Sequence, residues 1–350
     1  MSITPEELQL AARNHGMPLE ALRHDVTPLG LHYLLVHYDI PWVDLRDWRL
    51  EVGGAVERPL TLSMDDLRLR PTATEAVTME CAGNGRALLD PRPVSQPWLR
   101  EAVGTGEWTG TPLAGLLAEA GVVDGAVEVL FTGADRGVEE GVPQHYERAL
   151  PIAEALSDGA LLAWGLNGSV LPPQHGFPLR LVVPGWYGMT NVKWLTRITV
   201  LTEPFGGYQN RVAYRLRSDD DDPGTPVTRM MPRSLLVPPG VPDFFTRRRF
   251  LAAGEVTLEG RAWSGLAEIA AVDVSTDDGQ TWSQADLDAP VGRHAWRRFS
   301  AGWDAQPGDH VVCCRARDAA GNEQPLTPPW NVGGYANNAV HRVAVTVAAG

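Results

Sequence analysis

One cysteine lies in a segment whose composition suits chemistry. Residues 77–86 read VTMECAGNGR, so a short β-rich run delivers Cys81 into a loop with two glycines, an amide and an arginine. Glycines let the backbone approach a ligand closely, and the Arg86 guanidinium beside a thiol favours the thiolate by lowering its pKa. Because the thiolate is the form that binds metals or attacks carbon, Cys81 is a candidate metal ligand or nucleophile.

Three interpretations of Cys81 compete on the residues alone. A small buried hydrophobe is the most ordinary role of a cysteine. A nucleophile requires a base, for which His145 or His175 is a candidate, although neither stands in a catalytic signature. A metal ligand requires partners, yet the chain has no CxxC or HExxH pattern, so the other ligands would have to come from elsewhere, such as a cofactor.

A second group of polar residues lies between positions 164 and 194. His175, Arg180 and Lys193 fall within nineteen positions, separated by short apolar runs and glycine turns. Arginine and lysine both bind phosphate, and arginine can do so through two parallel hydrogen bonds. Ordinary solvation at strand ends explains any single member, whereas the cluster as a whole predicts a site for one phosphate or carboxylate.

The elements that must position these residues are short strands and short helices joined by loops rich in glycine and proline. A capping box predicts that a helix begins after Ser63, and Thr111-Pro112 predicts a capped amphipathic helix that ends before Gly121. This mixture predicts an α+β domain with its functional residues on loops. Strands are expected at 48–54, 127–131, 179–184 and 193–202.

An acidic run separates this region from one with a different pattern. Four aspartates at 219–222 precede a proline and a glycine, a combination that favours an exposed connection. We therefore predict a linker at 218–225 between a first domain at 1–217 and a second at 226–350. Beyond the linker the pattern is of strands alone, which predicts an Ig-like β-sandwich. Its strands are expected at 256–263, 270–276, 310–318 and 340–347.

The other two cysteines, Cys313 and Cys314, are neighbours in one of these strands. Because side chains alternate along a strand, Cys314 is predicted to face the core and Cys313 the opposite side, and a disulfide between them is not expected. Three cysteines in the whole chain are too few for a disulfide scaffold.

The composition and charge exclude several classes of protein. The 350 residues are 44% hydrophobic and 21% charged, as in soluble globular proteins. A net charge of −13 argues against binding to nucleic acid or an anionic membrane, because phosphates are held mainly by a basic surface. No run of about 18 apolar residues predicts a membrane span. The first thirty residues carry no export signal, so a cytoplasmic location is expected.

Several short motifs occur along the chain in a fixed order. In the first domain they are TMECAGNGR (78–86), GEWTG (106–110), LNG (166–168), HGFPLR (175–180) and VKW (192–194). In the second domain they are GRAWSG (260–265), VDVS (272–275), DGQTW (278–282) and PWN (329–331). From about residue 28 to about residue 347, the chain resembles the sulfite oxidase family of molybdenum-cofactor enzymes, of the bacterial type without a haem domain.

The resemblance implies a molybdopterin-binding α+β domain followed by an Ig-like domain through which two subunits pair as a homodimer. Cys81 would be the protein's thiolate ligand to molybdenum, and the other sulfurs would come from the pterin. The substrate pocket would include Arg86, Trp98 and Tyr214. The residues that would hold the pterin and its phosphate are Tyr33, His37, Asn84, Asp135, His175, Arg180, Asn191, Val192 and Lys193.

The implied activity is oxygen-atom transfer, with sulfite oxidised to sulfate and electrons passed to an external acceptor. Two departures from the family pattern bear on the substrate. Residues 33–37 read YLLVH where the family has aromatic-x-Arg-Asn-His, so the pocket lacks one positive charge. The arginine that the family's second domain lends to the pocket is not identifiable here. A reductase of S-oxides or N-oxides, or an oxidase of another small substrate, is therefore the first alternative; a non-enzymatic Ig-like binding protein and a cysteine hydrolase are the others.

Overall fold

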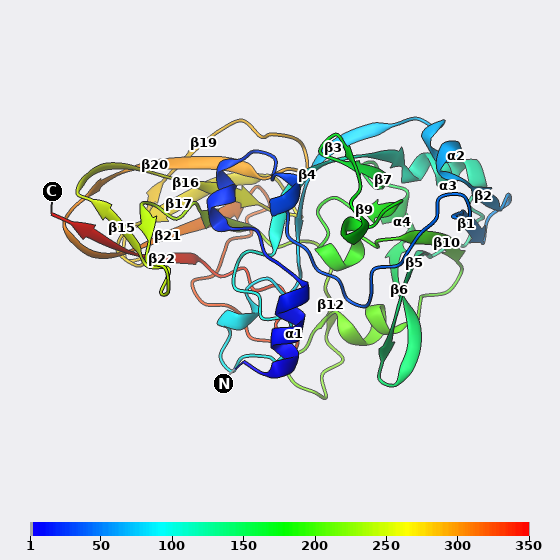
Figure 1. The fold of residues 1–350 in the computed structure, drawn as a ribbon, viewed down its shortest axis with the longest axis horizontal. Helices are drawn as coiled ribbons and strands as arrows, with labels where there is room; N and C mark the ends of the chain where they lie inside the picture. The colour runs from blue at the N-terminus through cyan, green and yellow to red at the C-terminus, as the bar shows by residue number, and fades with distance from the viewer. Residues whose placement is uncertain (1–2, 350) are drawn as a thin grey trace.

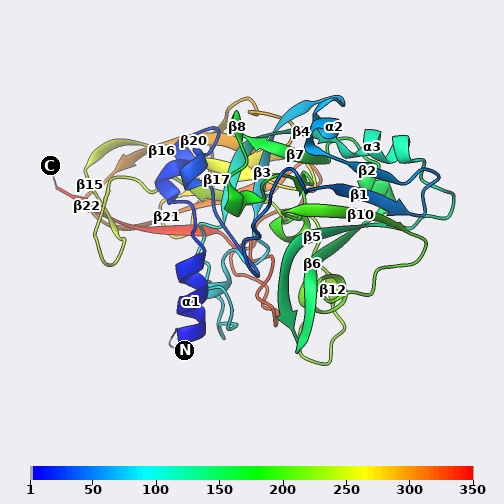
Figure 2. The same cartoon turned by 45° about the vertical axis from the view of Figure 1, so that its right-hand side comes forward.

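The computed structural model of the protein describes residues 3–349. Figure 1 shows two lobes along the long axis, with the N-terminal helix α1 (Pro5–Arg13) below the middle. We call the lobe that contains strands β1 to β10 the first lobe and the one that contains β13 to β22 the second lobe. In Figure 2, β5 and β6 extend from the first lobe as a long curved ribbon. No helix among residues 3–349 is long and apolar enough to cross a membrane.

Within the described residues, the first lobe holds two five-stranded sheets. One has the order β2-β1-β10-β5-β6 and consists of β1 (Leu50–Gly54), β2 (Leu60–Leu62), β5 (Glu128–Glu139), β6 (Val142–Pro151) and β10 (Leu195–Leu201). The other consists of β3 (Ala73–Glu80), β4 (Val103–Pro112), β7 (Leu161–Leu166), β8 (Ser169–Val170) and β9 (Arg180–Val182). The remaining helical elements are α2 (Met64–Arg68), α3 (Leu113–Ala120), α4 (Ile152–Ala155), η1 (Leu19–Arg23), η2 (Leu29–Leu31), η3 (Arg86–Leu88), η4 (Pro173–His175), η5 (Gly188–Thr190) and η6 (Gln209–Ala213).

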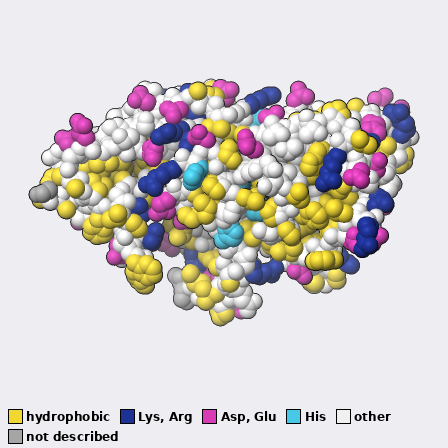
Figure 3. All heavy atoms as spheres, turned by 45° about the horizontal axis from the view of Figure 1, so that its top comes forward, with side chains coloured by type: hydrophobic (Ala, Val, Ile, Leu, Met, Phe, Trp, Pro, Cys, Tyr) yellow, Lys and Arg dark blue, Asp and Glu magenta, His cyan; other side chains and the backbone are white. Residues whose placement is uncertain are grey.

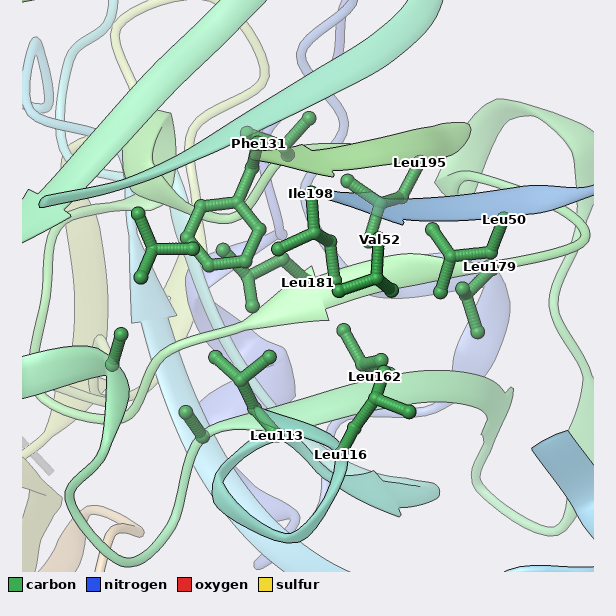
Figure 4. Packing of buried hydrophobic residues seen from close by; sticks show 14 of the residues in the cluster. Leu50, Val52, Leu113, Leu116, Phe131, Leu162, Leu179, Leu181, Leu195 and Ile198 are labelled. Atoms are coloured by element: carbon green, nitrogen blue, oxygen red, sulfur yellow. The ribbon is translucent and has the colours of Figure 1, made fainter. Parts of the chain in front are cut away.

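The core of the first lobe lies between these two sheets and is closed by helix α3. Figure 4 shows Phe131 and Ile198 from one sheet facing Leu162 and Leu181 from the other, with Leu113 of α3 beside them. All of these side chains are buried. Truncating a buried leucine to alanine costs about 2–5 kcal/mol of stability, so this core fixes the two sheets relative to each other. The loops at their edges are thereby held in place.

The local predictions for the first lobe are confirmed except for one helix cap. Helix α2 begins after Ser63, which forms the predicted capping box with Asp66. Helix α3 begins at Leu113 and ends before Gly121, whose φ is 71°. The expected cap by Thr111 is wrong, because its hydroxyl donates instead to the carbonyl of Leu67 and no side chain caps α3.

The second lobe is the predicted Ig-like β-sandwich. Its four-stranded sheet consists of β13 (Arg233–Leu236), β16 (Gly254–Trp263), β19 (Asp286–Leu287) and β20 (Arg297–Ala305). Its six-stranded sheet consists of β14 (Val241–Pro242), β15 (Arg249–Ala252), β17 (Ile269–Ser275), β18 (Ser283–Gln284), β21 (Gly308–Asp318) and β22 (His341–Ala348). Cys314 lies in the core between the sheets, as predicted, whereas the Cys313 thiol faces away from that core toward Asp278.

The predicted linker forms a compact exposed turn between two short paired strands. Strand β11 (Arg215–Leu216) pairs with β12 (Thr225–Pro226), and Asp222 accepts hydrogen bonds from the backbone of Ser218 and Gly224. The chain stays in contact with the first lobe beyond this turn, since the Met230 amide donates to the carbonyl of Gly185. The division at 218–225 into two domains stays a prediction.

Candidate cofactor site and substrate pocket

A cavity in the first lobe brings together residues from segments that are far apart in sequence. It is open to solvent on one side, and its space together with that opening amounts to about 610 Å³. Its walls come from the segment after η2, the end of β3, the β5–β6 ribbon, the η4–β9 and η5 segments, and the segment after η6. The residues that line it are His32, Tyr33, Leu34, Leu35, His37, Met79, Cys81, Asp135, Tyr146, His175, Arg180, Gly188, Met189, Asn191, Lys193 and Tyr214.

Cys81 lines this cavity directly after strand β3, which ends one residue before it. The Cys81 amide donates to the carbonyl of Ala102, and the Cys81 carbonyl accepts from the amide of Asn84, both at 2.9 Å. Burial raises the pKa of Cys81, and the opposing effect of Arg86 is smaller. Arg86 thus lowers the pKa of Cys81 as predicted, but desolvation outweighs this effect and the free thiolate is not favoured. A bound metal ion deprotonates a coordinating thiol outright, so burial is compatible with ligation.

Two buried cations form one wall of the cavity. Arg180 donates to the carbonyls of His175 at 2.9 Å and Asn191 at 3.2 Å, and its guanidinium lies 4.7 Å from the centre of the Trp108 ring. The Lys193 ammonium donates to the carbonyls of Leu35 at 2.7 Å and Gln174 at 3.0 Å. Burial and the charge of Arg180 lower the pKa of Lys193 to about 7. Lys193 is also the only lysine in the chain.

Burial shifts the pKa values of the other titratable groups of the cavity in the direction that favours their neutral forms. Burial and the nearby cations lower the pKa of His37 to about 3, while burial, His32 and the cations lower that of His175 to about 2. Burial raises the pKa of Asp135 to about 7, against the attraction of Lys193. His37 Nε2 and the Tyr214 hydroxyl share a hydrogen bond of 2.5 Å.

These groups fit a bound anion that also offers hydrogen-bond donors and acceptors. Arg180 Nε, Asp135 Oδ1 and His32 Nε2 are buried and have no hydrogen-bond partner among residues 3–349. Buried polar atoms are nearly always paired, and two buried cations side by side repel each other. A phosphate would neutralise Arg180 and Lys193, and the heteroatoms of a pterin would pair the remaining atoms. The residues present therefore fit a molybdopterin cofactor.

Four of the predicted site residues are buried but do not line the cavity. Asn84 stabilises the cysteine loop, because its amide donates to Glu80 and its oxygen accepts from the amide of Ala102. Val192 belongs to the core between the two sheets. Trp98 packs in the same apolar cluster as Cys81. The Arg86 guanidinium is turned toward the second lobe, where it donates to the carbonyl of Gly333.

The structure also adds wall residues that the sequence did not indicate. His32, Met79 and Tyr146 line the cavity beside the predicted residues. Tyr146 arrives there through the pairing of β5 with β6, and its hydroxyl donates to the carbonyl of Met189. Alternation along β6 could have placed Tyr146 on one face of a strand, but no local signal tells which face meets the cavity.

The positions of the histidines argue against a cysteine hydrolase. The His145 ring nitrogen Nδ1 is hydrogen-bonded to the carbonyl of Gly133, and His37 is paired with Tyr214. Within the described part of the chain, no histidine ring is hydrogen-bonded to the Cys81 thiol. A general base must lie within hydrogen-bond reach of the thiol that it activates. The geometry thus favours a ligand role for Cys81.

Comparisons with known proteins give the same family as the motifs. Residues 37–209 match the oxidoreductase molybdopterin binding domain, and residues 233–348 match the Mo-co oxidoreductase dimerisation domain. Sulfite oxidase of Gallus gallus is 37% identical over 336 residues, covering 91% of this chain and 72% of that protein. Mitochondrial sulfite oxidase of Mus musculus is 35% identical over 341 residues, covering 92% of this chain.

The fold of a solved structure agrees with these matches. The sulfane dehydrogenase SoxCD from Paracoccus pantotrophus superposes with a TM-score of 0.82 at 28% identity, covering 95% of this chain and 84% of that one. The chain spans 62% of the length of the Mus musculus protein. The protein belongs to the sulfite oxidase family of molybdopterin oxidoreductases, and the predicted fold class is confirmed.

Proposed function

We propose that the protein is a molybdenum-dependent oxidoreductase that oxidises sulfite to sulfate and passes the electrons to an external one-electron acceptor. The observation that carries this proposal is that one cavity joins the buried Cys81 thiol to the cations Arg180 and Lys193. A thiolate ligand at one end and a phosphate site at the other are the two anchors that a molybdopterin cofactor requires. The likeness to sulfite oxidases supports the choice of substrate.

The residues of the cavity divide into those that hold the cofactor and those that face the substrate. Arg180 and Lys193 would bind the phosphate, while Asp135, His37 and Asn191 would pair the heteroatoms of the pterin. Cys81 would ligate the metal. When bound, the cofactor supplies two-electron redox chemistry and a transferable oxygen atom. The protein itself shields the site from bulk water in part, because Cys81, Asp135, Arg180 and Asn191 are buried while His37 and Lys193 are half-buried.

Tyr214 and His37 form a hydrogen-bonded pair that lines the same cavity as the thiol. Burial raises the pKa of Tyr214 well above its usual value and lowers that of His37 to about 3. The tyrosine is therefore protonated and the histidine neutral, and the direction of the hydrogen bond between the Tyr214 hydroxyl and His37 Nε2 is set by the imidazole tautomer. In the net reaction, SO₃²⁻ and H₂O give SO₄²⁻, two protons and two electrons. A buried tyrosine–histidine pair can hold one of these protons at a defined atom.

Elemental and pterin analysis combined with turnover tests this proposal. Protein made in a host that supplies the cofactor should contain about one molybdenum and one pterin per chain, and it should oxidise sulfite with ferricyanide as acceptor. The Cys81→Ser variant should lose turnover while its circular dichroism spectrum stays unchanged. Molybdenum-loaded protein that oxidises neither sulfite nor any other sulfur compound would refute the proposal.

A second candidate function rests on the wall residue Leu35. An apolar side chain lines the cavity where the family has an arginine, so the cavity has one cation fewer for an anionic substrate. The loss of this cation would weaken the binding of a neutral S-oxide or N-oxide less than the binding of sulfite. This reductase hypothesis requires that the loaded protein reduce dimethyl sulfoxide or trimethylamine N-oxide with a reduced dye faster than it oxidises sulfite.

We also propose that two copies of the chain pair through the second lobe. The match of residues 233–348 to a dimerisation domain supports this. In the same region, Phe244 and Phe245 are each 90% exposed. Light scattering should give twice the chain mass, and a Phe244→Ser/Phe245→Ser variant should shift the mass toward that of one chain if these rings lie in the interface. A monomeric wild type would overturn the pairing.

A further inference from the structure

A loop of the second lobe is hydrogen-bonded directly onto the cysteine loop of the first. Residues 331–337 read NVGGYAN. The Ala336 amide donates to the carbonyl of Ala82, and the Asn337 side chain donates to the carbonyl of Gly85, both at 2.8 Å. The backbone of this loop therefore follows residues 81–86 closely, and its side chains can reach the surroundings of the thiol.

The position of Tyr335 within this loop is fixed on both sides. The Tyr335 amide donates to the side chain of Asn331 at 2.9 Å, and the Asn331 amide group donates back to the Tyr335 carbonyl at 2.8 Å. The Tyr335 ring centre lies 5.2 Å from that of Tyr214. A Cβ atom at Gly333 would lie 2.3 Å from the Tyr335 ring, so a side chain at position 333 and the ring of Tyr335 exclude each other.

Tyr335 covers Arg86, the arginine of the cysteine loop. The Arg86 guanidinium carbon lies 5.0 Å from the centre of the Tyr335 ring. Its Nε donates to the carbonyl of Gly333 at 2.8 Å, and one terminal nitrogen donates to the carbonyl of Gln96 at 3.3 Å. The face of the Arg86 guanidinium packs on an aromatic ring and its edge donates to two carbonyls, so most of its interactions are made within the protein. It is absent from the residues that line the cavity.

Leu35 removes a second charge from the same region. Its side chain lines the cavity, and its carbonyl accepts a hydrogen bond from Lys193. All sixteen residues that line the cavity come from positions up to 214, so the second lobe contributes no arginine to its wall. Leu35 and the aromatic residues Tyr33, Tyr146 and Tyr214 line the cavity together with Cys81, whereas the Arg148 guanidinium, 5.5 Å from the centre of the Tyr214 ring, is not among the lining residues. Burying a doubly charged ion without paired cations is costly.

We propose that Tyr335 and Leu35 make this site selective for an organic sulfinate over the sulfite dianion; the inference rests on the oxidation of sulfur compounds proposed above. An organic sulfinate is a sulfur nucleophile with one negative charge and an apolar substituent R. In the reaction, R–SO₂⁻ and H₂O give R–SO₃⁻, two protons and two electrons. One S–O bond forms, sulfur is oxidised, and the electrons pass to the same one-electron acceptor. Tyr335 acts through Arg86 and is a positioning residue, whereas Leu35 faces the cavity.

The test compares methanesulfinate with sulfite as substrates of the cofactor-loaded protein, with ferricyanide as acceptor. The wild type should show at least tenfold higher kcat/KM for methanesulfinate. Leu35→Arg should shift the ratio of the two kcat/KM values at least tenfold toward sulfite, and the change should lie in KM more than in kcat. Leu69→Arg is the matched control, because Leu69 is 86% exposed and gains the same charge without changing the ratio.

Variants of Tyr335 separate the role of its ring from that of its hydroxyl. Tyr335→Phe keeps the ring over Arg86 and should keep the preference for methanesulfinate. Tyr335→Leu uncovers Arg86 and should move the ratio toward sulfite. Calorimetry with the two product ions gives a readout that does not depend on turnover: the wild type should bind methanesulfonate more tightly than sulfate, and Leu35→Arg should reverse this order.

The outcomes distinguish the inference from the function on which it rests. A wild type that prefers sulfite, with ratios that change less than twofold in Leu35→Arg, would overturn the inference while leaving sulfite oxidation in place. Loaded protein that oxidises neither compound would overturn the proposed function itself. If Tyr335→Leu does not fold, the calorimetric order in Leu35→Arg decides the question alone.

Discussion

A buried ion pair behind Cys81 should contribute more to stability than any exposed pair in the protein. Arg233, in β13 of the second lobe, donates to Glu80 at 2.6 Å, and both side chains are at most 2% exposed. Glu80 is the last residue of β3 and directly precedes Cys81. Its second carboxylate oxygen accepts from the indole of Trp263 at 2.9 Å. The pair thus joins the two lobes immediately behind the thiol.

Replacing Arg233 by methionine leaves the Glu80 carboxylate buried without a cation. Removing one partner of a buried pair costs about 3–5 kcal/mol, because the remaining charge is neither solvated nor neutralised. Arg233 also donates to the carbonyls of Asn84 and Asn337, so its loss leaves two more acceptors unpaired. We expect Arg233→Met to lower the free energy of unfolding by at least about 3 kcal/mol on these grounds.

Urea unfolding followed by fluorescence measures this loss, and an exposed pair provides the control. Arg298 and Glu259 are also 2.6 Å apart, but their side chains are 45% and 26% exposed. Arg298→Met should therefore cost less than about 1 kcal/mol. Glu80→Gln combined with Arg233→Met should cost less than the two single changes added together, since no lone charge remains. If Arg233→Met costs no more than Arg298→Met, the reasoning from burial is refuted.

Two further predictions concern the cavity. Lys193→Met should reduce pterin retention at least tenfold without unfolding the chain. Lys193 is the only lysine, and its pKa is about 7. An amine-acylating reagent should therefore label Lys193 in cofactor-free protein but not in loaded protein, and mass spectrometry reads the label. Equal labelling in both forms would contradict this. Burial lowers the pKa of His175 to about 2, against about 6.5 in the unfolded chain. Below pH 6.5 the unfolded chain therefore takes up a proton at this histidine that the folded protein does not. The free energy of unfolding falls as the pH decreases below 6.5. Between pH 7 and 5.5 the cofactor-free wild type should lose about 1 kcal/mol more than His175→Gln in denaturant unfolding, and parallel pH profiles would speak against a buried neutral histidine.

Much of the fold could be predicted because its signals are local. The capping box at Ser63 and the turn at Asp278 involve residues only a few positions apart, and both appear in the structure. Thr111 shows where local reasoning fails, because its hydroxyl finds a partner in Leu67, on a neighbouring helix. A sequence pattern cannot weigh a cap against a tertiary hydrogen bond.

The site could be predicted only in part, because segments distant in sequence assemble it. Motif resemblance indicated Cys81, Arg180 and Lys193, and the structure places all three around one cavity. Their roles as ligands stay predictions. The hydrogen bond of Arg86 to Gly333 and its packing on Tyr335 could not be predicted, because both depend on how the second lobe packs on the first. Figure 3 shows charges of both signs interleaved over one face of the molecule, in keeping with the mixed charge of the sequence.

X-ray absorption at the molybdenum edge of the loaded protein tests the central claim most directly. If Cys81 is the protein's ligand to the metal, the wild type should show one more sulfur neighbour than Cys81→Ser, at equal molybdenum loading of the sample. Identical sulfur coordination in the two proteins would contradict the account, because the thiol that lines the cavity would then not bind the metal.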